Sequence, residues 1–301
     1  MSQQTAFLAP DGFADDLVRE LGEAVSEVHG RLVVAHGPER PAAWAANVWR
    51  EPRRIPIASI GDAATKLRAI QRSWALYPVA HHRRAALIEE RLPKVSAKAI
   101  EFGTPAPTSP LGSWTLLAPD MMLASPSCSS AFAHGEVRFI EDRTSSPSRA
   151  YLKLWEAFTV LGVKPMAGEL CLDLGSSPGG WTWVLAGLGA RVISVDKAPL
   201  DPRIAAMPGV EERRESAFGI DPRSHSTPAV DWLCSDVICY PARLLGLVER
   251  WLATGKAQRF ICSVKFQGET DFGVIDAFKA IPGSRLMHLS ANKHELTWVK
   301  L

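Results

Sequence analysis

From residue 148 onward, short apolar segments alternate with longer connections, and this alternation restricts the fold more than any other feature of the chain. Seven candidate strand segments, most of them rich in β-branched and apolar residues, occur at 169–175, 190–196, 210–216, 230–237, 259–266, 284–290 and 295–301. Most are separated by stretches long enough for crossover helices, which favours a mostly parallel, doubly wound seven-stranded sheet. Only four residues separate the last two segments, so we expect a hairpin that makes the final strand antiparallel. A helix over 149–162 precedes the first strand.

The first 140 residues follow a less regular pattern. Apolar residues at helical spacing predict helices over 12–28, 60–76 and 89–100, although Pro93 interrupts the last. The composition from 103 to 130 shifts to prolines and serines, which is typical of loops around short strands, here 113–118. A further strand is expected over 136–140, and a linker over 141–149. The sequence therefore predicts a smaller α+β domain over 1–140 and a Rossmann-like α/β domain over 141–301.

Composition narrows the class of protein. Five cysteines are scattered without C-x-x-C spacing, which favours reduced thiols in a cytoplasmic protein over a disulfide framework or a zinc site. The first residues are polar and acidic, unlike a signal peptide, and no apolar run has the length of a membrane helix. We therefore expect a cytoplasmic protein with no membrane partner and no metal. The sequence leaves the oligomeric state open.

Charge is unevenly distributed along the chain. Residues 50–98 hold eleven lysines and arginines against four acids, whereas residues 1–30 hold six acids against one arginine. A local basic band of this kind can attract the phosphates of RNA, and its candidate contacts are Arg50, Arg53, Arg54, Arg83 and Arg84. The alternative is that these side chains belong to ordinary solvated helices.

The stretch DLGSSPGGWT at residues 173–182 joins the first predicted strand of the C-terminal domain to a helix. Glycines at such a turn let the backbone approach a ligand at the carboxyl end of the sheet. Asp196 closes the next strand 21 residues after Gly175, where a carboxylate can accept both hydroxyls of a ribose. The loop is neither a G-x-G-x-x-G fingerprint nor a P-loop, so we interpret it as a site for S-adenosylmethionine. A glycine-rich turn with only a packing role is the alternative.

These motifs resemble those of the FtsJ/RrmJ-like ribose 2′-O-methyltransferases. DLGSSPGGWT resembles their first motif, and SRAYLKL at 148–154 resembles the helix that carries their first catalytic lysine. By order and context, the family's Lys-Asp-Lys-Glu tetrad falls on Lys153, Asp236, Lys265 and Glu295. Within the family, residues 145–301 most resemble the RlmM branch, which methylates a cytidine ribose in 23S ribosomal RNA.

The resemblance implies an RNA ribose 2′-O-methyltransferase that converts S-adenosyl-L-methionine to S-adenosyl-L-homocysteine. It implies that Lys265 takes the proton of the 2′-hydroxyl, that Lys153 supplies a neighbouring cation, and that Asp236 and Glu295 orient the lysines. The residues implied to hold the cofactor are Gly175, Ser177, Pro178, Gly179, Gly180, Trp181, Asp196, Ser216 and Asp236.

Two departures from the family pattern stand out. Ser216 takes the place of the acid that generally ends the third strand and binds the adenine edge. The RlmM branch also carries a THUMP-type RNA-binding domain. Residues 1–140 are too few to hold a complete copy, so we expect a truncated or altered version. The expected partner is RNA, with ribosomal RNA as the first expectation.

Other functions stay open on the sequence alone. An enzyme of the same fold acting on a transfer RNA or an mRNA cap would differ only in the N-terminal half. A non-catalytic RNA-binding protein that keeps the fold is a second alternative, supported by Ser216 alone, and a small-molecule methyltransferase is a third. Taken alone, Lys153 is expected to be an exposed lysine. Asp236 and Lys265 end apolar strands, which argues against plain surface roles, and a structural ion pair is their alternative. The order of all four residues around the glycine motif favours the enzyme.

Overall fold

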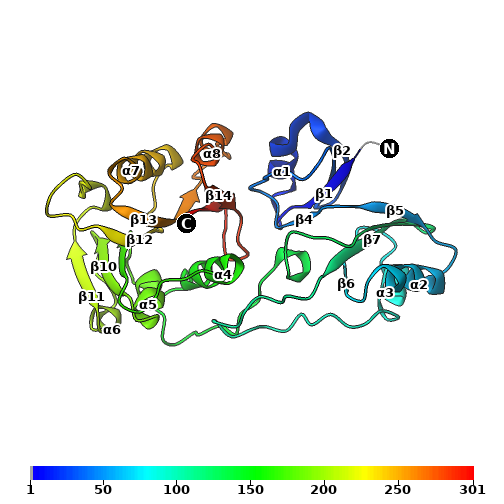
Figure 1. Ribbon diagram of the computed structural model, residues 1–301, viewed down its shortest axis with the longest axis horizontal. Helices are drawn as coiled ribbons and strands as arrows, with labels where there is room; N and C mark the ends of the chain where they lie inside the picture. Colours follow the sequence, from blue (N-terminus) through cyan, green and yellow to red (C-terminus); the bar gives the residue numbers. More distant parts are fainter. Residues whose placement is uncertain (1–2) are drawn as a thin grey trace. The chain divides into compact units, whose positions relative to one another are not determined.

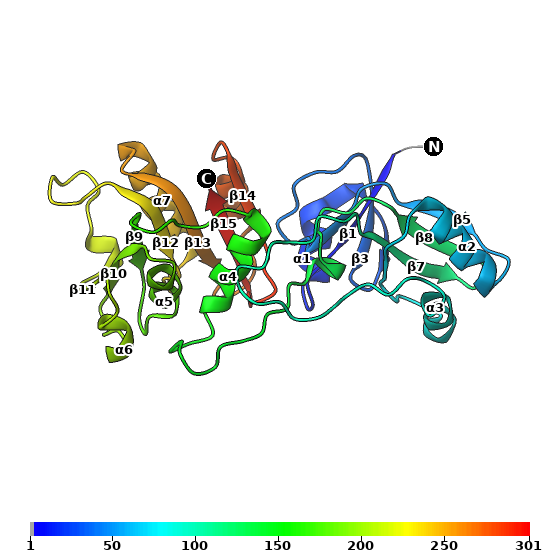
Figure 2. The ribbon, with the colours of Figure 1, turned by 60° about the horizontal axis from the view of Figure 1, so that its bottom comes forward.

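The computed structural model describes residues 3–301. The chain forms two compact units, and the boundary between them in the sequence lies after Arg138. Figures 1 and 2 show each unit as an assembly of sheets and helices. The arrangement within each unit follows from its own sequence, and each is described separately below.

The first sheet of the N-terminal unit has four strands in the order β2-β3-β1-β4, with antiparallel pairing. Its elements are β1 (Gln4–Leu8), α1 (Ala14–Leu21), the 3-10 turn η1 (Gly22–Ala24), β2 (Val25–His29), β3 (Leu32–His36) and β4 (Asn47–Trp49). β1 and β3 are almost fully buried, and apolar residues occupy three of the five positions of β1 and four of the five of β3. Helix α1 packs against β3 and buries Leu17 and Leu21.

The second sheet of this unit has the order β5-β8-β7-β6. Its elements are β5 (Arg53–Pro56), α2 (Ile60–Ile70), β6 (Trp74–Leu76), α3 (His82–Glu89), β7 (Gly112–Ala118), β8 (Met121–Ser125) and the 3-10 turn η2 (Ala133–Gly135). Helices α2 and α3 pack on the sheet through a shared core that includes Leu67, Trp74, Ile88, Trp114 and Met122. The unit thus combines two sheets with three helices, in agreement with the predicted α+β class.

Several boundaries predicted for this unit are wrong. The helix predicted over 12–28 ends at Leu21, because Gly22 takes a positive φ of 58° and the next residues form β2. The helix predicted over 60–76 ends at Ile70, and residues 74–76 pair with β7 instead. Residues 93–99 and 136–140 form no regular helix or strand. In the first two cases, pairing with another strand, the adjacent β3 or the distant β7, outweighs the local helical pattern.

The C-terminal unit is built on one seven-stranded sheet in the order β11-β10-β9-β12-β13-β15-β14. Its strands are β9 (Leu170–Leu174), β10 (Arg191–Asp196), β11 (Val210–Arg214), β12 (Val230–Ser235), β13 (Ala257–Lys265), β14 (Ser284–Met287) and β15 (Glu295–Lys300). β15 runs antiparallel to both of its neighbours, and the pairings among β9 to β13 are parallel. The predicted Rossmann-like sheet with an antiparallel last strand is confirmed.

Helices cover both faces of this sheet. They are α4 (Tyr151–Leu161), α5 (Gly180–Gly187), α6 (Pro202–Ala205), α7 (Pro241–Thr254) and α8 (Phe272–Lys279), with the 3-10 turn η3 at Ala217–Gly219. α4 and α5 lie on one face, and α7 and α8 lie on the other (Figure 1). β9 and β12 occupy the middle of the sheet, and their residues are almost all buried because both faces are covered. β9 and β12 are parallel neighbours, so the turns that follow them lie at the same carboxyl edge of the sheet. The strand order reverses between these two strands, which is where ligands bind in open α/β sheets.

Candidate active site

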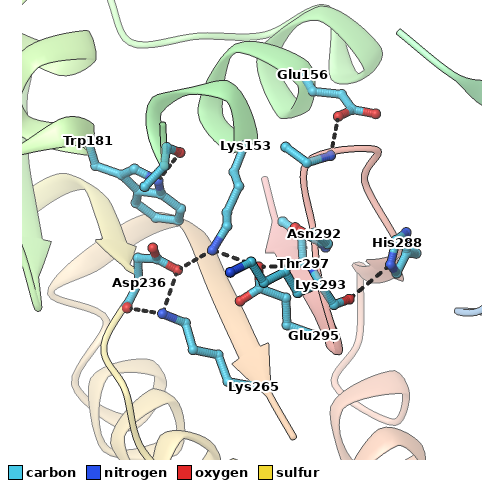
Figure 3. A network of polar contacts seen from close by, with 12 residues as sticks. Lys153, Glu156, Trp181, Asp236, Lys265, His288, Asn292, Lys293, Glu295 and Thr297 are labelled. Carbon is cyan, nitrogen blue, oxygen red and sulfur yellow. Dashed lines mark hydrogen bonds and ion pairs between the residues drawn. The ribbon is translucent and has the colours of Figure 1, made fainter. Parts of the chain in front are cut away.

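Four charged side chains meet at the carboxyl edge of the C-terminal sheet, as Figure 3 shows. The Lys153 ammonium lies 2.9 Å from Asp236 Oδ1 and 2.7 Å from Glu295 Oε1. The Lys265 ammonium lies 3.0 Å from the same Asp236 oxygen and donates a 2.6 Å hydrogen bond to the Asp236 backbone carbonyl. The structure thus brings together the four residues that the sequence nominated as a tetrad.

The topology explains this convergence. Asp236 follows the end of β12, and Lys265 ends the neighbouring parallel strand β13, so both lie at the same edge of the sheet. Glu295 begins the antiparallel strand β15 and stands opposite Lys265 in the register. Lys153 comes from helix α4, whose first two turns are mostly buried. Four elements from distant parts of the sequence therefore supply one residue each.

Burial makes these ion pairs electrostatically strong. Each of the four side chains is at most 18% exposed, so water screens their charges weakly. Burial by itself lowers the pKa of Lys153, but the carboxylates of Asp236 and Glu295 outweigh it and the net pKa is raised. Burial opposes ionisation of Asp236, yet the two lysine ammonium groups lower its pKa overall. The cluster therefore holds a charged lysine between two carboxylates.

The glycine loop after β9 is a tight backbone cradle. Gly175 has a φ of 77°, and a Cβ atom there would lie 2.6 Å from the Cα of Val237. Gly179 also has a positive φ, of 114°, and forms the N-cap of α5. The amide of Ser177 donates a 3.1 Å hydrogen bond to Asp196 Oδ2, which ties the loop to the end of β10. Only glycine fits at Gly175, since any side chain would collide with backbone.

The last residues of the loop contact the residues at the start of α4. The Ser177–Pro178 peptide bond is cis, and a Cβ atom on Gly180 would lie 2.4 Å from the hydroxyl of Ser148. Trp181 is only 2% exposed, and its indole N–H donates a 2.9 Å hydrogen bond to the carbonyl of Ala150. That bond joins α5 to the start of α4, which carries Lys153.

A pocket of about 190 Å³ opens beside this loop. Its lining includes Gly175 and Asp196 from the first two strand ends, together with Ser216, which follows β11. The Arg243 guanidinium lies over the Phe218 ring at 3.8 Å from its centre and closes another side of the pocket. Each carboxylate oxygen of Asp196 accepts one backbone hydrogen bond, from Ser177 or Ala198, and retains capacity for another donor.

Two residues that sequence reasoning missed support the site from within. Asp173 is fully buried in β9 and accepts a 2.7 Å hydrogen bond from the Thr182 hydroxyl. Burial raises the pKa of Asp173 to about 7, and the nearby carboxylates of Asp236 and Asp196 add to this effect. An acid within an otherwise apolar strand was the available signal in the sequence.

Glu156 is the second. It lies one helical turn after Lys153 in α4 and is 3% exposed. Its carboxylate accepts hydrogen bonds of 2.8 and 2.9 Å from the backbone and hydroxyl of Ser290, and one of 3.3 Å from the amide of Ala291. This holds the loop between β14 and β15, and β15 then places Glu295 beside Lys153. No local pattern identifies a partner 134 residues away.

The candidate RNA contacts of the N-terminal unit divide into two groups. Arg50, Arg53 and Arg54 each form an ion pair with a glutamate of the same unit. Arg83 and Arg84 belong to α3 and form no ion pair within residues 3–301. The excess positive charge of the predicted band therefore lies at α3 more than at β5.

Neither a membrane-spanning helix nor a metal-binding cluster occurs within residues 3–301. Within residues 3–301, no helix combines the length and hydrophobicity needed to cross a membrane. The same residues contain no cluster of three or more histidine, cysteine, aspartate or glutamate side chains arranged to hold a metal ion.

The C-terminal part of the chain is similar in sequence to known proteins. Three similar curated proteins are ribosomal RNA large subunit methyltransferases M, and the alignments span 35–44% of their lengths. The one from Halorhodospira halophila is 41% identical over 40% of this chain and 35% of its own length. The protein from Aromatoleum aromaticum is 34% identical over 50% of this chain and 44% of its own length. The protein from Azoarcus sp. is 33% identical over 48% of this chain and 40% of its own length. Residues 147–267 match the model of the FtsJ-like methyltransferase family.

Proposed function

We propose that this protein is an S-adenosylmethionine-dependent RNA ribose 2′-O-methyltransferase that acts on ribosomal RNA. The observation that carries the proposal is the buried contact of Lys153, Asp236, Lys265 and Glu295 beside the Gly175 cradle. A ribose hydroxyl is a poor nucleophile until its proton leaves, and this cluster holds an amine where a proton acceptor is needed. The names of the similar proteins support ribosomal RNA as the substrate class.

The residues around the cradle fit S-adenosylmethionine. Asp196 has free acceptor capacity for ribose hydroxyls, and the backbone at Gly175 leaves space that a side chain would fill. The pocket that Ser216 and Phe218 line would take the purine, with the serine hydroxyl replacing the usual acid. When bound, S-adenosylmethionine supplies a methyl group that leaves its sulfonium sulfur for the attacking oxygen and yields S-adenosylhomocysteine.

Lys265 is the proposed base: its ammonium, paired with Asp236 in the resting site, first releases its own proton to solvent. A neutral amine has two N–H bonds and one lone pair, and Lys265 Nζ has two acceptors, the carbonyl oxygen and Oδ1 of Asp236. Donation to both acceptors directs the lone pair toward the remaining side, where it can take the proton of the 2′-hydroxyl. Deprotonation makes the oxygen a nucleophile, as an adjacent general base does in other enzymes.

The other three residues position Lys265 and control charge. Lys153 stays protonated because two carboxylates raise its pKa, so it presents a fixed positive charge near the developing oxyanion. Asp236 orients both lysines, and Glu295 holds Lys153 from the opposite side. Holding the reacting groups in line supplies a further part of the rate.

The test combines cofactor binding with methyl transfer. Purified protein is titrated with S-adenosylmethionine and S-adenosylhomocysteine by calorimetry, and transfer is measured on an in vitro transcript of large-subunit ribosomal RNA. The nucleosides of the product are then analysed by mass spectrometry, and alkaline hydrolysis locates the modified position, because a 2′-O-methyl group blocks cleavage there. Lys265→Ala is expected to abolish transfer while leaving cofactor binding nearly unchanged.

Lys300→Ala serves as the matched control, because Lys300 lies on β15 and donates to the carbonyl of Pro282. The control should retain wild-type transfer. Full activity in Lys265→Ala would refute the base assignment, and a base-methylated product would refute the ribose chemistry. Binding of RNA without binding of either cofactor form would instead support the non-catalytic alternative.

A further inference from the structure

Two large apolar side chains stand in solvent immediately after Asp236. Ile238 is 80% exposed and Tyr240 is 68% exposed, the two highest values among the large hydrophobic residues that the structure describes. Isolated exposed apolar residues are common on protein surfaces. These two occupy alternate positions of one short segment, with the buried Cys239 between them, and the segment starts at the charged cluster.

The backbone of this segment is held at both ends. At its start, the Lys265 ammonium binds the carbonyl of Asp236, and Val237 packs against the bare Cα of Gly175. At its end, the Tyr240 carbonyl accepts hydrogen bonds of 3.0 and 3.3 Å from the first turn of α7, where Pro241 restricts the backbone further. The two exposed side chains thus project from a rigid support, which lowers the entropic cost of using them to bind.

The neighbours of the segment indicate what it would bind. Ile238 lines the same pocket as Asp196 and Ser216, so it borders the proposed cofactor site. Arg243 lines this pocket together with Ile238, and Lys265 binds the carbonyl of Asp236 at the start of the segment, so two cationic side chains border it. An apolar surface flanked by cations suits a nucleobase attached to a phosphodiester chain, because bases stack on aromatic rings while phosphates pair with cations.

We propose that Ile238 and Tyr240 form a stacking platform for the base of the nucleotide to be methylated. Tyr240 stacks on the face of the base, and Ile238 fills the space between the base and the cofactor pocket. A base held there carries its ribose toward Lys265, whose partner Asp236 begins the same segment. The proposal rests on the proposed function and adds the residues that recognise the substrate.

Steady-state kinetics provides the first test, with the ribosomal RNA transcript as the varied substrate. Tyr240→Ala is expected to raise the KM for RNA on the order of tenfold to a hundredfold, as loss of base stacking does in other proteins, and Tyr240→Phe should restore it. The affinity of Tyr240→Ala for S-adenosylmethionine should be unchanged, which also shows that the variant is folded. Met166→Ala is the control, since Met166 is 65% exposed in the same unit and has no place in the site. Equal KM values for Tyr240→Ala and Met166→Ala would overturn the platform.

A second test needs no methyl transfer. A short single-stranded RNA that contains 2-aminopurine loses fluorescence when the modified base stacks on an aromatic ring. Quenching by wild type and Tyr240→Phe, and its loss in Tyr240→Ala, is the expected pattern. Equal quenching by all three proteins, or none with wild type, would overturn the platform. Tyrosine-dependent quenching in a protein without transferase activity would keep the platform and refute the proposed function instead.

Discussion

Asp173 makes the stability of the protein depend on pH in a predictable direction. Its carboxyl group is fully buried, and burial raises its pKa from 3.8 to about 7. A raised pKa in the folded state means that the folded protein binds this proton more tightly than the unfolded chain does. The stabilisation is therefore complete below the unfolded pKa, near 4, and is lost as the pH rises through the folded pKa, near 7.

The size of the effect follows from the same pKa. Each pH unit within this window changes the free energy of unfolding by about 1.4 kcal/mol. Between about pH 5 and about pH 8, Asp173 should therefore destabilise the protein by about 3 kcal/mol, because only the last part of the interval lies above its pKa. Replacing it by asparagine, which does not titrate, should remove this contribution whatever the variant's stability at a single pH.

Urea denaturation of wild type and Asp173→Asn at the two pH values, at constant ionic strength, measures the contribution. The wild type should lose about 3 kcal/mol more than the variant on going to the higher pH. Asp201→Asn is the control: the pKa of this exposed carboxyl is lowered, so it is ionised at both pH values and its removal should leave the wild-type dependence intact. The same pH dependence in wild type and Asp173→Asn would refute the reasoning.

Three further outcomes are expected. Gly175→Ala should lower the free energy of unfolding by about 3 kcal/mol and impair cofactor binding, because the new Cβ would lie 2.6 Å from the backbone of Val237. Gly187→Ala is the control: nothing lies within 4 Å of its Cβ position, so the substitution should be neutral or stabilising. Arg243→Ala should raise the Kd of S-adenosylmethionine about threefold to tenfold in calorimetry, through loss of the cation over the pocket's aromatic ring. Glu156→Gln should lower the free energy of unfolding by about 2 kcal/mol, measured with urea, because a neutral amide holds the β14–β15 loop less strongly than a carboxylate does.

The C-terminal unit could be predicted from sequence because its signals are local. Most of its strands are short apolar runs bounded by polar or glycine residues, and the short connection between Met287 and Glu295 makes the last strand antiparallel. The carboxyl ends of parallel strands share one edge, so placing Asp236 and Lys265 at strand ends already placed them near each other. Their chemical roles remain predictions.

The N-terminal unit could not be predicted as well, because its strands depend on pairing with partners outside their own segments. Val25 and Val28 continue a helical spacing, yet the turn at Gly30 brings them back onto β3, and the ladder decides their conformation. Trp74 fits a helix pattern, but its indole N–H caps the carbonyls of Leu67 and Gln71 while its backbone pairs with β7. The same limit applies to Glu156 in the site, whose partners become visible only in the folded chain.

The position of β15 in the sheet has a consequence for how the protein is made. β14 pairs with no strand of the sheet except β15, and β15 inserts between β13 and β14. During synthesis, the edge of β13 therefore stays open, and Lys153 lacks its second carboxylate, until β15 has left the ribosome. The nascent chain can fold most of the sheet but cannot complete the charge cluster. The order of translation thereby leaves the charge cluster incomplete until this strand is available.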